Sequence, residues 1–205
     1  MSIRRALALA VAAFSFPPAS LTHAAIVFDE AVSGDLSGSG LTPSSISLGV
    51  GSNQIFGSTG RDALGVDRDY FTVQIPAGYA FVSLLELAGT TVVSGVSFIA
   101  IQGGTQVTVS QTPVDATGLL GWNHFAPTAV DTEILAALGS GGFGATDFTP
   151  PLPAGNYAFW IQDTGLGSSS YGFDIVVAVP EPGAAAALLV GVVALGVARG
   201  RPRRG

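Results

Sequence analysis

The stretch DYFTVQIPAGYAFVSLLEL, Asp69–Leu87, contains two runs of β-favouring residues separated by a turn sequence. Its first part, Asp69–Ile75, alternates polar and apolar residues, which is the period of a strand with one buried face. Pro76-Ala-Gly78 then interrupts the run, because proline fixes φ and glycine readily supplies a positive φ. The second part, Tyr79–Leu87, is again aliphatic and aromatic. The stretch therefore predicts two strands joined by a tight turn.

The rest of the central region continues this pattern of short apolar runs between turn residues. The further expected strands are Ile26–Phe28, Ser45–Val50, Val92–Val93, Ser97–Ile101, Thr105–Ser110, Asn156–Ile161 and Tyr171–Val177. Residues 25–178 are therefore predicted to form an all-β domain, an antiparallel β-sandwich of jelly-roll-like form.

Three local features refine this prediction. Gly103-Gly104 is a hairpin signal between the runs that end and begin beside it. The loop 163–170 is expected to join the last two strands as an antiparallel pair. Thr132–Leu138 is expected to be the one short helix, with Asp131 as its cap.

Composition and charge exclude several classes of function. The 205 residues contain no cysteine, so disulfides, thiolate catalysis and cysteine-based metal sites are excluded. The formal net charge is −6, and binding to phosphates needs clustered cations, so no nucleic-acid partner is expected. Between Ala25 and Pro180, two arginines face thirteen acids, a net charge of −11. The remaining arginines lie at the two ends, which indicates that the ends have a different role from the middle.

The first 24 residues have the three parts of a secretory signal peptide. Arg4 and Arg5 precede an apolar run at residues 6–16, and Pro17-Pro18 ends that run. The run is too short to span a bilayer. Signal peptidase is expected to cut after Ala24, where Thr22 and Ala24 are the small residues at −3 and −1, and cleavage after Ala25 is the alternative. The alternative is that this run is an apolar first element of the domain.

The last 27 residues, 179–205, form a second three-part segment. An uncharged apolar run of 16 residues, 183–198, would span ~24 Å as a helix, and flanking arginines can extend a short membrane span by snorkelling. Arginines after the run place that end in the cytoplasm and the domain outside the inner membrane. The segment begins with Val179, Pro180, Glu181, Pro182 and Gly183, and its basic end carries Arg199, Arg201, Arg203 and Arg204.

This tail resembles the PEP-CTERM sorting signal of exported proteins in Gram-negative bacteria, in the motif, the apolar helix and the arginine cluster just named. The resemblance implies transient insertion in the inner membrane as a single transmembrane helix, recognition by an exosortase and removal of the tail. It also implies delivery to the cell surface or the extracellular polymeric matrix. The alternative is a simple C-terminal membrane anchor after a proline-rich hinge.

The central domain is similar to bacterial pre-peptidase C-terminal domains over residues 66–178. The similarity is carried by Asp69-Tyr-Phe-Thr-Val73, the two Pro-Ala-Gly turns at 76–78 and 153–155, and the closing run Tyr171-Gly-Phe-Asp-Ile175. It implies a small β-sandwich of the kind that serves as an accessory module of secreted enzymes. This chain is expected to depart from the pattern in its long insertion at 103–149 and in standing alone.

Few residues of the domain are suited to chemistry. Once the signal peptide is removed, His124 is the remaining histidine, and no Gly-x-Ser-x-Gly elbow is present, which disfavours a serine hydrolase. Asp67 and Asp69, two residues apart at the start of a strand, are candidate calcium ligands. The alternative is a solvent turn in which Arg68 neutralises them. Trp122, in the expected loop 121–125, is the candidate for stacking on a glycan, whereas aromatic residues inside strands are expected to pack in the core.

These observations predict a non-enzymatic structural protein of the cell surface or of an exopolysaccharide, biofilm-associated matrix. Its expected partners are signal peptidase, an exosortase, the inner membrane and extracellular polysaccharide. Calcium is the candidate ion. A carbohydrate-binding module is the first alternative, and a secreted hydrolase or its accessory domain is the second.

Overall fold

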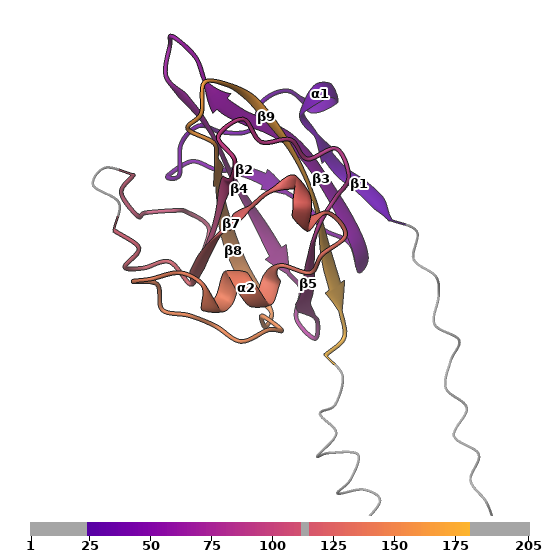
Figure 1. The fold of residues 1–205 in the computed structure, drawn as a ribbon. Coiled ribbons are helices and arrows are strands. Elements are labelled where there is room, and N and C mark those ends of the chain that lie inside the picture. The colour runs from indigo at the N-terminus through magenta and orange to yellow at the C-terminus, as the bar shows by residue number, and fades with distance from the viewer. Residues whose placement is uncertain (1–23, 112–114, 181–205) are drawn as a thin grey trace, which may run out of the picture.

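The computed structural model describes residues 24–111 and 115–180, and these residues fold almost entirely as strands and loops (Figure 1). The all-β prediction is therefore confirmed. The strands are β1 (Ala25–Asp29), β2 (Ser44–Ile46), β3 (Gly51–Arg61), β4 (Val66–Ile75), β5 (Ala80–Glu86), β6 (Ser97–Gly103), β7 (Gly121–Phe125), β8 (Gly155–Gln162) and β9 (Gly167–Ala178). The helical elements are α1 (Glu30–Ser33), the 3₁₀ turn η1 (Pro127–Ala129) and α2 (Leu135–Ser140).

The predicted processing segments lie largely outside these ranges. Residues 1–23 of the expected signal peptide and residues 181–205 of the expected sorting tail lie outside the described residues. The expected transmembrane run 183–198 therefore lies outside them as well. Ala24, Val179 and Pro180, which border the two segments, are exposed. Within the described ranges, no helix has the length and apolar character needed to cross a membrane.

The strands form one curled sheet with the order β5-β9-β3-β4-β8-β6-β7. Neighbours in this order are antiparallel, while β1 pairs in parallel with β3 and β2 in parallel with β4. The β3–β4 pairing is limited to Gly60↔Asp67 and Arg61↔Val66, at the hairpin. Beyond these two pairs β3 and β4 follow different partners, so the sheet folds over at this hairpin into two halves.

The hydrophobic core fills the inside of the curl. Alternate residues of each strand face it, because successive side chains in a strand point to opposite faces. Phe159 of β8 stacks on Phe71 of the neighbouring β4 at 4.8 Å and also contacts Phe81 of β5, in the other half, at 6.2 Å between ring centroids. Phe125 and Phe173 similarly contact across the two halves at 5.0 Å. These contacts hold the halves face to face.

The two edge strands of the sheet, β5 and β7, are bridged by the segment after β7. The amide of Ile134 donates to the Leu84 carbonyl at 2.8 Å, and the Asp131 amide donates to the Glu86 carbonyl at 2.7 Å. Helix α2 then packs against β5, β6 and β7 and buries Leu135 and Leu138 in the core. The segment thus satisfies backbone groups of β5 that an open edge would leave unpaired.

A second, smaller apolar cluster lies on the outer face of β4, β8 and β6. It is centred on Trp160, which stacks with Tyr70 at 5.8 Å between ring centroids. Val107, which follows β6, and Leu119, which precedes β7, are buried in this cluster. The insertion predicted from the sequence therefore serves partly as a cover for the outer face of the sheet.

Several local predictions are corrected by the structure. Thr105–Ser110 and Val92–Val93 are not strands, and β6 pairs with β7, 17 residues farther along the chain, which leaves the Gly103-Gly104 hairpin prediction wrong. The strands β8 and β9 are not paired with each other, because β8 lies between β4 and β6, and β9 between β3 and β5.

The predicted helix exists but starts later than expected, at Leu135. Asp131 has a positive φ of 59° and precedes the helix. The Glu133 carboxylate, instead of Asp131, accepts the first free amides, those of Leu135 at 2.7 Å and Ala136 at 3.4 Å.

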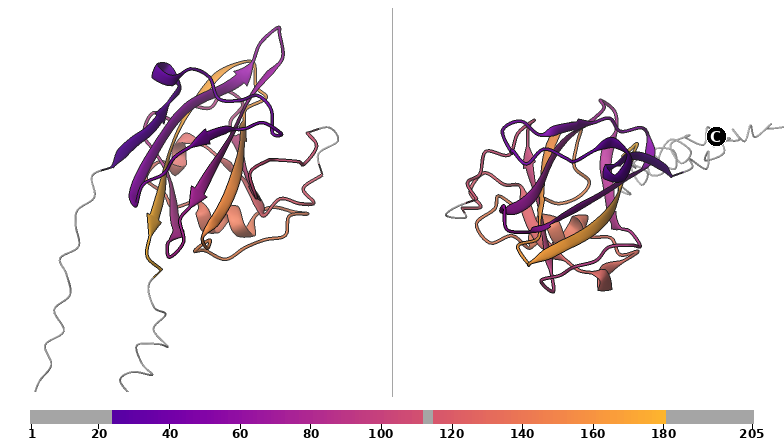
Figure 2. Two further views of the ribbon diagram at one scale, coloured as in Figure 1. Left: turned by 180° about the vertical axis from the view of Figure 1, so that it is seen from behind. Right: turned by 90° about the horizontal axis from the view of Figure 1, so that it is seen from above.

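Both ends of the domain lie at the same end of the sheet. Ala25 of β1 and Ile175 of β9 flank the same residue, Asn53 of β3, in the strand register. The hairpin between β3 and β4, together with α1, lies toward the opposite end (Figure 2). The chain thus enters and leaves the domain at one pole, which is called the terminal pole below, and the other is called the hairpin pole.

Candidate functional site

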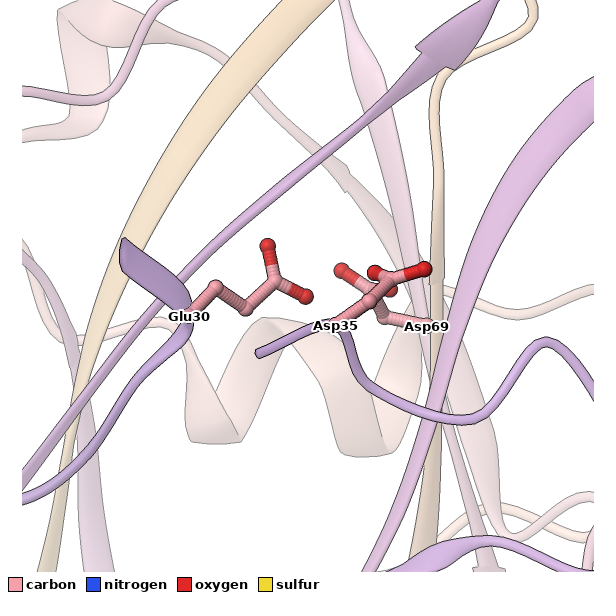
Figure 3. Close-up of side chains that lie close together, drawn as sticks. All are labelled: Glu30, Asp35 and Asp69. Atoms are coloured by element: carbon pink, nitrogen blue, oxygen red, sulfur yellow. The ribbon is translucent and has the colours of Figure 1, made fainter. Parts of the chain in front are cut away.

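Three carboxylates from separate segments converge near the hairpin pole. Glu30 begins α1, Asp35 follows that helix, and Asp69 lies on β4. One oxygen of each lies within 4.8 Å of the corresponding oxygens of the other two, and Figure 3 shows the three side chains turned toward one another. These three residues are called the acidic cluster.

Backbone and hydroxyl groups fix the Glu30 side chain. Its Oε1 accepts the Leu36 amide at 3.1 Å, and its Oε2 accepts the Ser58 amide at 2.7 Å and the Ser58 hydroxyl at 3.2 Å. Because α1 follows β1 directly and β1 pairs with β3, the carboxylate is held against the sheet. The Glu30 carboxylate is thus held in place by the surrounding backbone and hydroxyl groups.

Asp69 is the most buried member of the acidic cluster, with an exposed fraction of 0%. Its Oδ2 accepts a hydrogen bond from the Tyr171 hydroxyl at 2.7 Å. Its Oδ1 is buried and has no hydrogen-bond partner among the described residues. A buried polar atom without a partner is costly, since its water of hydration has been removed and not replaced.

The proton affinities of these acids follow from burial and mutual repulsion. Burial and, after it, the Glu30 charge raise the pKa of Asp69 from 3.8 to about 8, against the lowering effect of the Tyr171 hydrogen bond. Burial also raises the pKa of Glu30, against the Leu36 and Ser58 amides. The cluster therefore disfavours its own full ionisation unless positive charge is supplied.

The sequence prediction placed calcium between Asp67 and Asp69. In the structure these two residues have different surroundings. Asp69 belongs to the acidic cluster, whereas Asp67 is exposed and lies beside it, where both burial and the Asp35 charge raise its pKa. Asp67, Glu30 and Asp35 line one open pocket of about 640 Å³. Calcium at Asp67 and Asp69 thus stays a prediction, with the second residue placed among different neighbours.

Sequence reasoning missed Glu30 and Asp35. They lie 34 to 39 residues before Asp69, and no local spacing connects them to β4. The one available signal was that both acids flank a Gly-containing turn directly after the first strand.

The predicted glycan residue, Trp122, lies on the edge strand β7 and not in a loop. It is half-buried, and its Nε1 donates to the Phe143 carbonyl at 3.2 Å. Trp122 and Phe98 lie 5.8 Å apart between ring centroids, and Phe98 in turn meets Trp160 edge-on at 4.9 Å. This row of rings crosses β7, β6 and β8.

A pocket of about 430 Å³ lies along this row of rings, and we call it the aromatic pocket. Its walls are Phe98, Asp115, Ala116, Leu119, Trp122, His124, Phe143, Gly144 and Trp160. Trp160 Nε1 is buried and has no hydrogen-bond partner among the described residues. His124 is exposed, and its ring meets Trp122 edge-on at 5.6 Å.

Comparison of the chain with family models, curated proteins and solved structures found no match.

Proposed function

We propose that this chain is an exported, non-enzymatic structural protein of the bacterial cell surface or of an exopolysaccharide, biofilm-associated matrix. In this proposal signal peptidase removes residues 1–24, and an exosortase recognises the motif at Val179–Gly183 and removes the tail. The observation that carries the proposal is the sequence of the tail: a Pro-Glu-Pro motif, an uncharged apolar run and four arginines occur in that order. The signal-like N-terminus supports the same topology independently.

The fold is compatible with this role. We infer that the two halves of the curled sheet act as the layers of a jelly-roll-like β-sandwich, since Phe81 and Phe125 each contact a ring of the opposite half. Both domain ends lie at the terminal pole, so a tether at either end leaves the hairpin pole directed outward. The excess of acids over arginines in the domain suits bridging of anionic polymers by divalent cations.

The first test is the intact mass and cell fraction of the mature protein, expressed in an exosortase-containing Gram-negative host. The expected product begins near Ala25, ends within residues 179–183 and is recovered outside the inner membrane. A matched variant, Glu181→Ala, should keep its tail and remain in the inner membrane. A wild-type product that retains residues 183–205 in the inner membrane would contradict the sorting proposal.

Carbohydrate binding is the second candidate function, and the aromatic pocket favours it. Sugars are commonly held by an aromatic face together with hydrogen-bonding groups. The pocket offers the Trp122 ring, the buried Trp160 N–H and the Asp115 carboxylate. In this proposal one sugar ring of an extracellular polysaccharide lies against Trp122 and accepts a hydrogen bond from Trp160.

Binding of the full-length chain to arrayed neutral and acidic polysaccharides tests this candidate. Trp122→Ala should weaken binding about tenfold or more, while Trp122→Phe should retain most of it. The matched control is Leu166→Ala, which removes an exposed apolar side chain outside the pocket. Equal binding by wild type and Trp122→Ala, or no glycan bound by wild type, would exclude it.

A further inference from the structure

We propose that the acidic cluster of Glu30, Asp35 and Asp69 binds one calcium ion. The proposal rests on the geometry of these side chains and not on the export of the chain. The three ligand oxygens lie within 4.8 Å of one another. Two oxygens on opposite sides of a calcium ion, each 2.3–2.6 Å from it, are separated by about the same distance.

The unpartnered oxygen of Asp69 is the second observation that points to a ligand. Asp69 is fully buried, and the Tyr171 hydroxyl satisfies its Oδ2 but not its Oδ1. The Asp69 side chain turns toward Glu30 and Asp35 (Figure 3), and its Oδ1 has no hydrogen-bond partner among the described residues. A cation at this position would satisfy the oxygen and offset the cost of burying it.

The protein itself supplies little positive charge to this cluster. Arg61 and Arg68 are the two arginines between Ala25 and Pro180. The Arg68 guanidinium donates to Gln162 Oε1 at 2.9 Å and to the Val66 carbonyl at 3.4 Å. Each cluster acid instead lies beside the other two, since one oxygen of each is within 4.8 Å of the others. The missing charge therefore has to come from bound protons or from a bound cation.

The donor set selects the class of cation. All three ligands are carboxylates, and hard oxygen ligands favour calcium, magnesium or manganese over zinc and copper. Magnesium requires near-ideal octahedral geometry at 2.0–2.1 Å, which would draw the oxygens closer together than calcium does. Asp35 is exposed, so water can complete the six to eight ligands that calcium takes. Calcium is therefore the cation that this arrangement fits best.

Calcium at this position would bind segments that belong to different parts of the fold. Glu30 and Asp35 belong to the connection between β1 and β2, while Asp69 belongs to β4 and is linked through Tyr171 to β9. One ion would thus tie the connection to both halves of the sheet at the hairpin pole. Binding should raise the stability of the fold with the logarithm of the calcium concentration above Kd.

The test uses the full-length chain, first freed of metal with a chelator. Calcium titration by calorimetry should give one site with a Kd of roughly 10⁻⁴–10⁻³ M, the range of extracellular calcium modules. Magnesium should bind at least about tenfold more weakly. Terbium should replace calcium and luminesce on excitation of tyrosine, because Tyr171 contacts the cluster.

Two variants and one control make the test specific. Asp35→Asn and Asp69→Asn should each weaken calcium binding about tenfold or more. In chelator Asp69→Asn should unfold at a higher temperature than wild type, because it removes the repulsion between this buried acid and its two acidic neighbours. Asp147→Asn, at an exposed acid outside the cluster, should bind as wild type does. Absence of saturable calcium binding by wild type, or wild-type affinity in both cluster variants, would overturn the proposal. In those cases protons shared among the acids account for the cluster.

Discussion

The Tyr171 hydroxyl lies 2.7 Å from Asp69 Oδ2 and joins β9 to β4 across the interior of the curled sheet. The two strands are not neighbours, so no backbone pairing accompanies this contact. Tyr171 is paired in register with Gly57 on β3, and a Cβ at Gly57 would collide with the Tyr171 ring and hydroxyl. The absence of a side chain at Gly57 therefore lets the tyrosine reach Asp69.

Removal of the Tyr171 hydroxyl should destabilise the fold, because the buried Asp69 then has no hydrogen-bond donor. In Tyr171→Phe the Oδ2 of Asp69 loses its partner, so neither oxygen has one. We therefore expect a loss of roughly 1–3 kcal/mol in the free energy of unfolding. The comparison variant is Tyr157→Phe, which removes a 2.7 Å hydrogen bond to the Pro153 carbonyl at a more accessible position. Urea denaturation at neutral pH checks both. A smaller loss for Tyr171→Phe than for Tyr157→Phe would contradict the role given to this contact.

A methyl group at Gly57 should be poorly tolerated. Gly57→Ala places its Cβ against Tyr171, and insertion of a carbon into a packed site typically costs about 1–3 kcal/mol. Gly49→Ala is the matched control, because its Cβ would lie 3.7 Å from the nearest atom, Asn53 Oδ1. We expect thermal unfolding to separate the two variants clearly. Equal midpoints would mean that the tyrosine moves away freely.

Glu86 should make the fold less stable as the pH rises. It is fully buried on β5, and both carboxylate oxygens lack a hydrogen-bond partner among the described residues. Burial raises its pKa from 4.5 to about 7, with the Ala126 amide opposing the shift. The folded state thus holds a proton that the unfolded state releases, so stability falls between about pH 4.5 and pH 7.

Glu86→Gln removes this dependence and should be more stable than wild type at pH 8, by on the order of 2–3 kcal/mol. Urea denaturation from pH 4 to pH 8 measures it. The control Asp147→Asn changes an exposed acid, and its free energy of unfolding should change with pH as in wild type. If the free energy of unfolding falls with pH as steeply in Glu86→Gln as in wild type, Glu86 is excluded as the source of the pH dependence.

Asp163 should make the fold less stable as the pH falls, which is the opposite of the effect of Glu86. Burial alone would raise its pKa, but hydrogen bonds from Ser169, Ser94, the Gly165 amide and Ser97 lower the pKa to about 2. Its stabilising contribution is therefore present above the unfolded pKa of 3.8 and is lost as the pH falls toward 2.

Asp163→Asn should lose roughly 2 kcal/mol or more at neutral pH, because an amide nitrogen cannot accept the hydrogen bonds that one carboxylate oxygen accepts. Asp62→Asn is the matched control, since Asp62 uses only Oδ1 to accept the Leu64 and Gly65 amides and asparagine keeps that oxygen. Denaturation at pH 7 and pH 3 distinguishes them. Similar losses in both variants would contradict the assignment.

The fold class could be predicted from the sequence because alternation and turn residues are local signals. Asp69–Ile75 and the Pro-Ala-Gly turn after it appear in the structure as the end of β4 and its turn into β5. The 11-residue strand β3 was missed, since its glycines and polar residues weaken the strand pattern. Pairing with β9 along its whole length stabilises β3 as a strand although its composition has a low strand propensity. Such pairing between distant segments cannot be recognised in a local sequence pattern.

The candidate sites were predictable only in part, for the same reason. The sequence identified Asp69 as a candidate ligand but paired it with its neighbour Asp67, because spacing along a strand is the one geometry that a sequence gives directly. Glu30 and Asp35 reach Asp69 through the β1–β2 connection, which depends on the whole fold. Trp122 was predicted to be a loop residue, since its strand is short and lies far from its partner β6 along the chain.

The shared position of the two domain ends determines how the domain responds to mechanical force. Tension applied between the ends would peel β1 and β9 from β3 one hydrogen bond at a time, because both strands are gripped at the same pole. Tension between the C-terminal end and the β3–β4 hairpin would instead shear β9 along the whole length of β3, loading all of those hydrogen bonds together. A domain tethered through its C-terminus and pulled at the hairpin pole is thus loaded in its resistant direction.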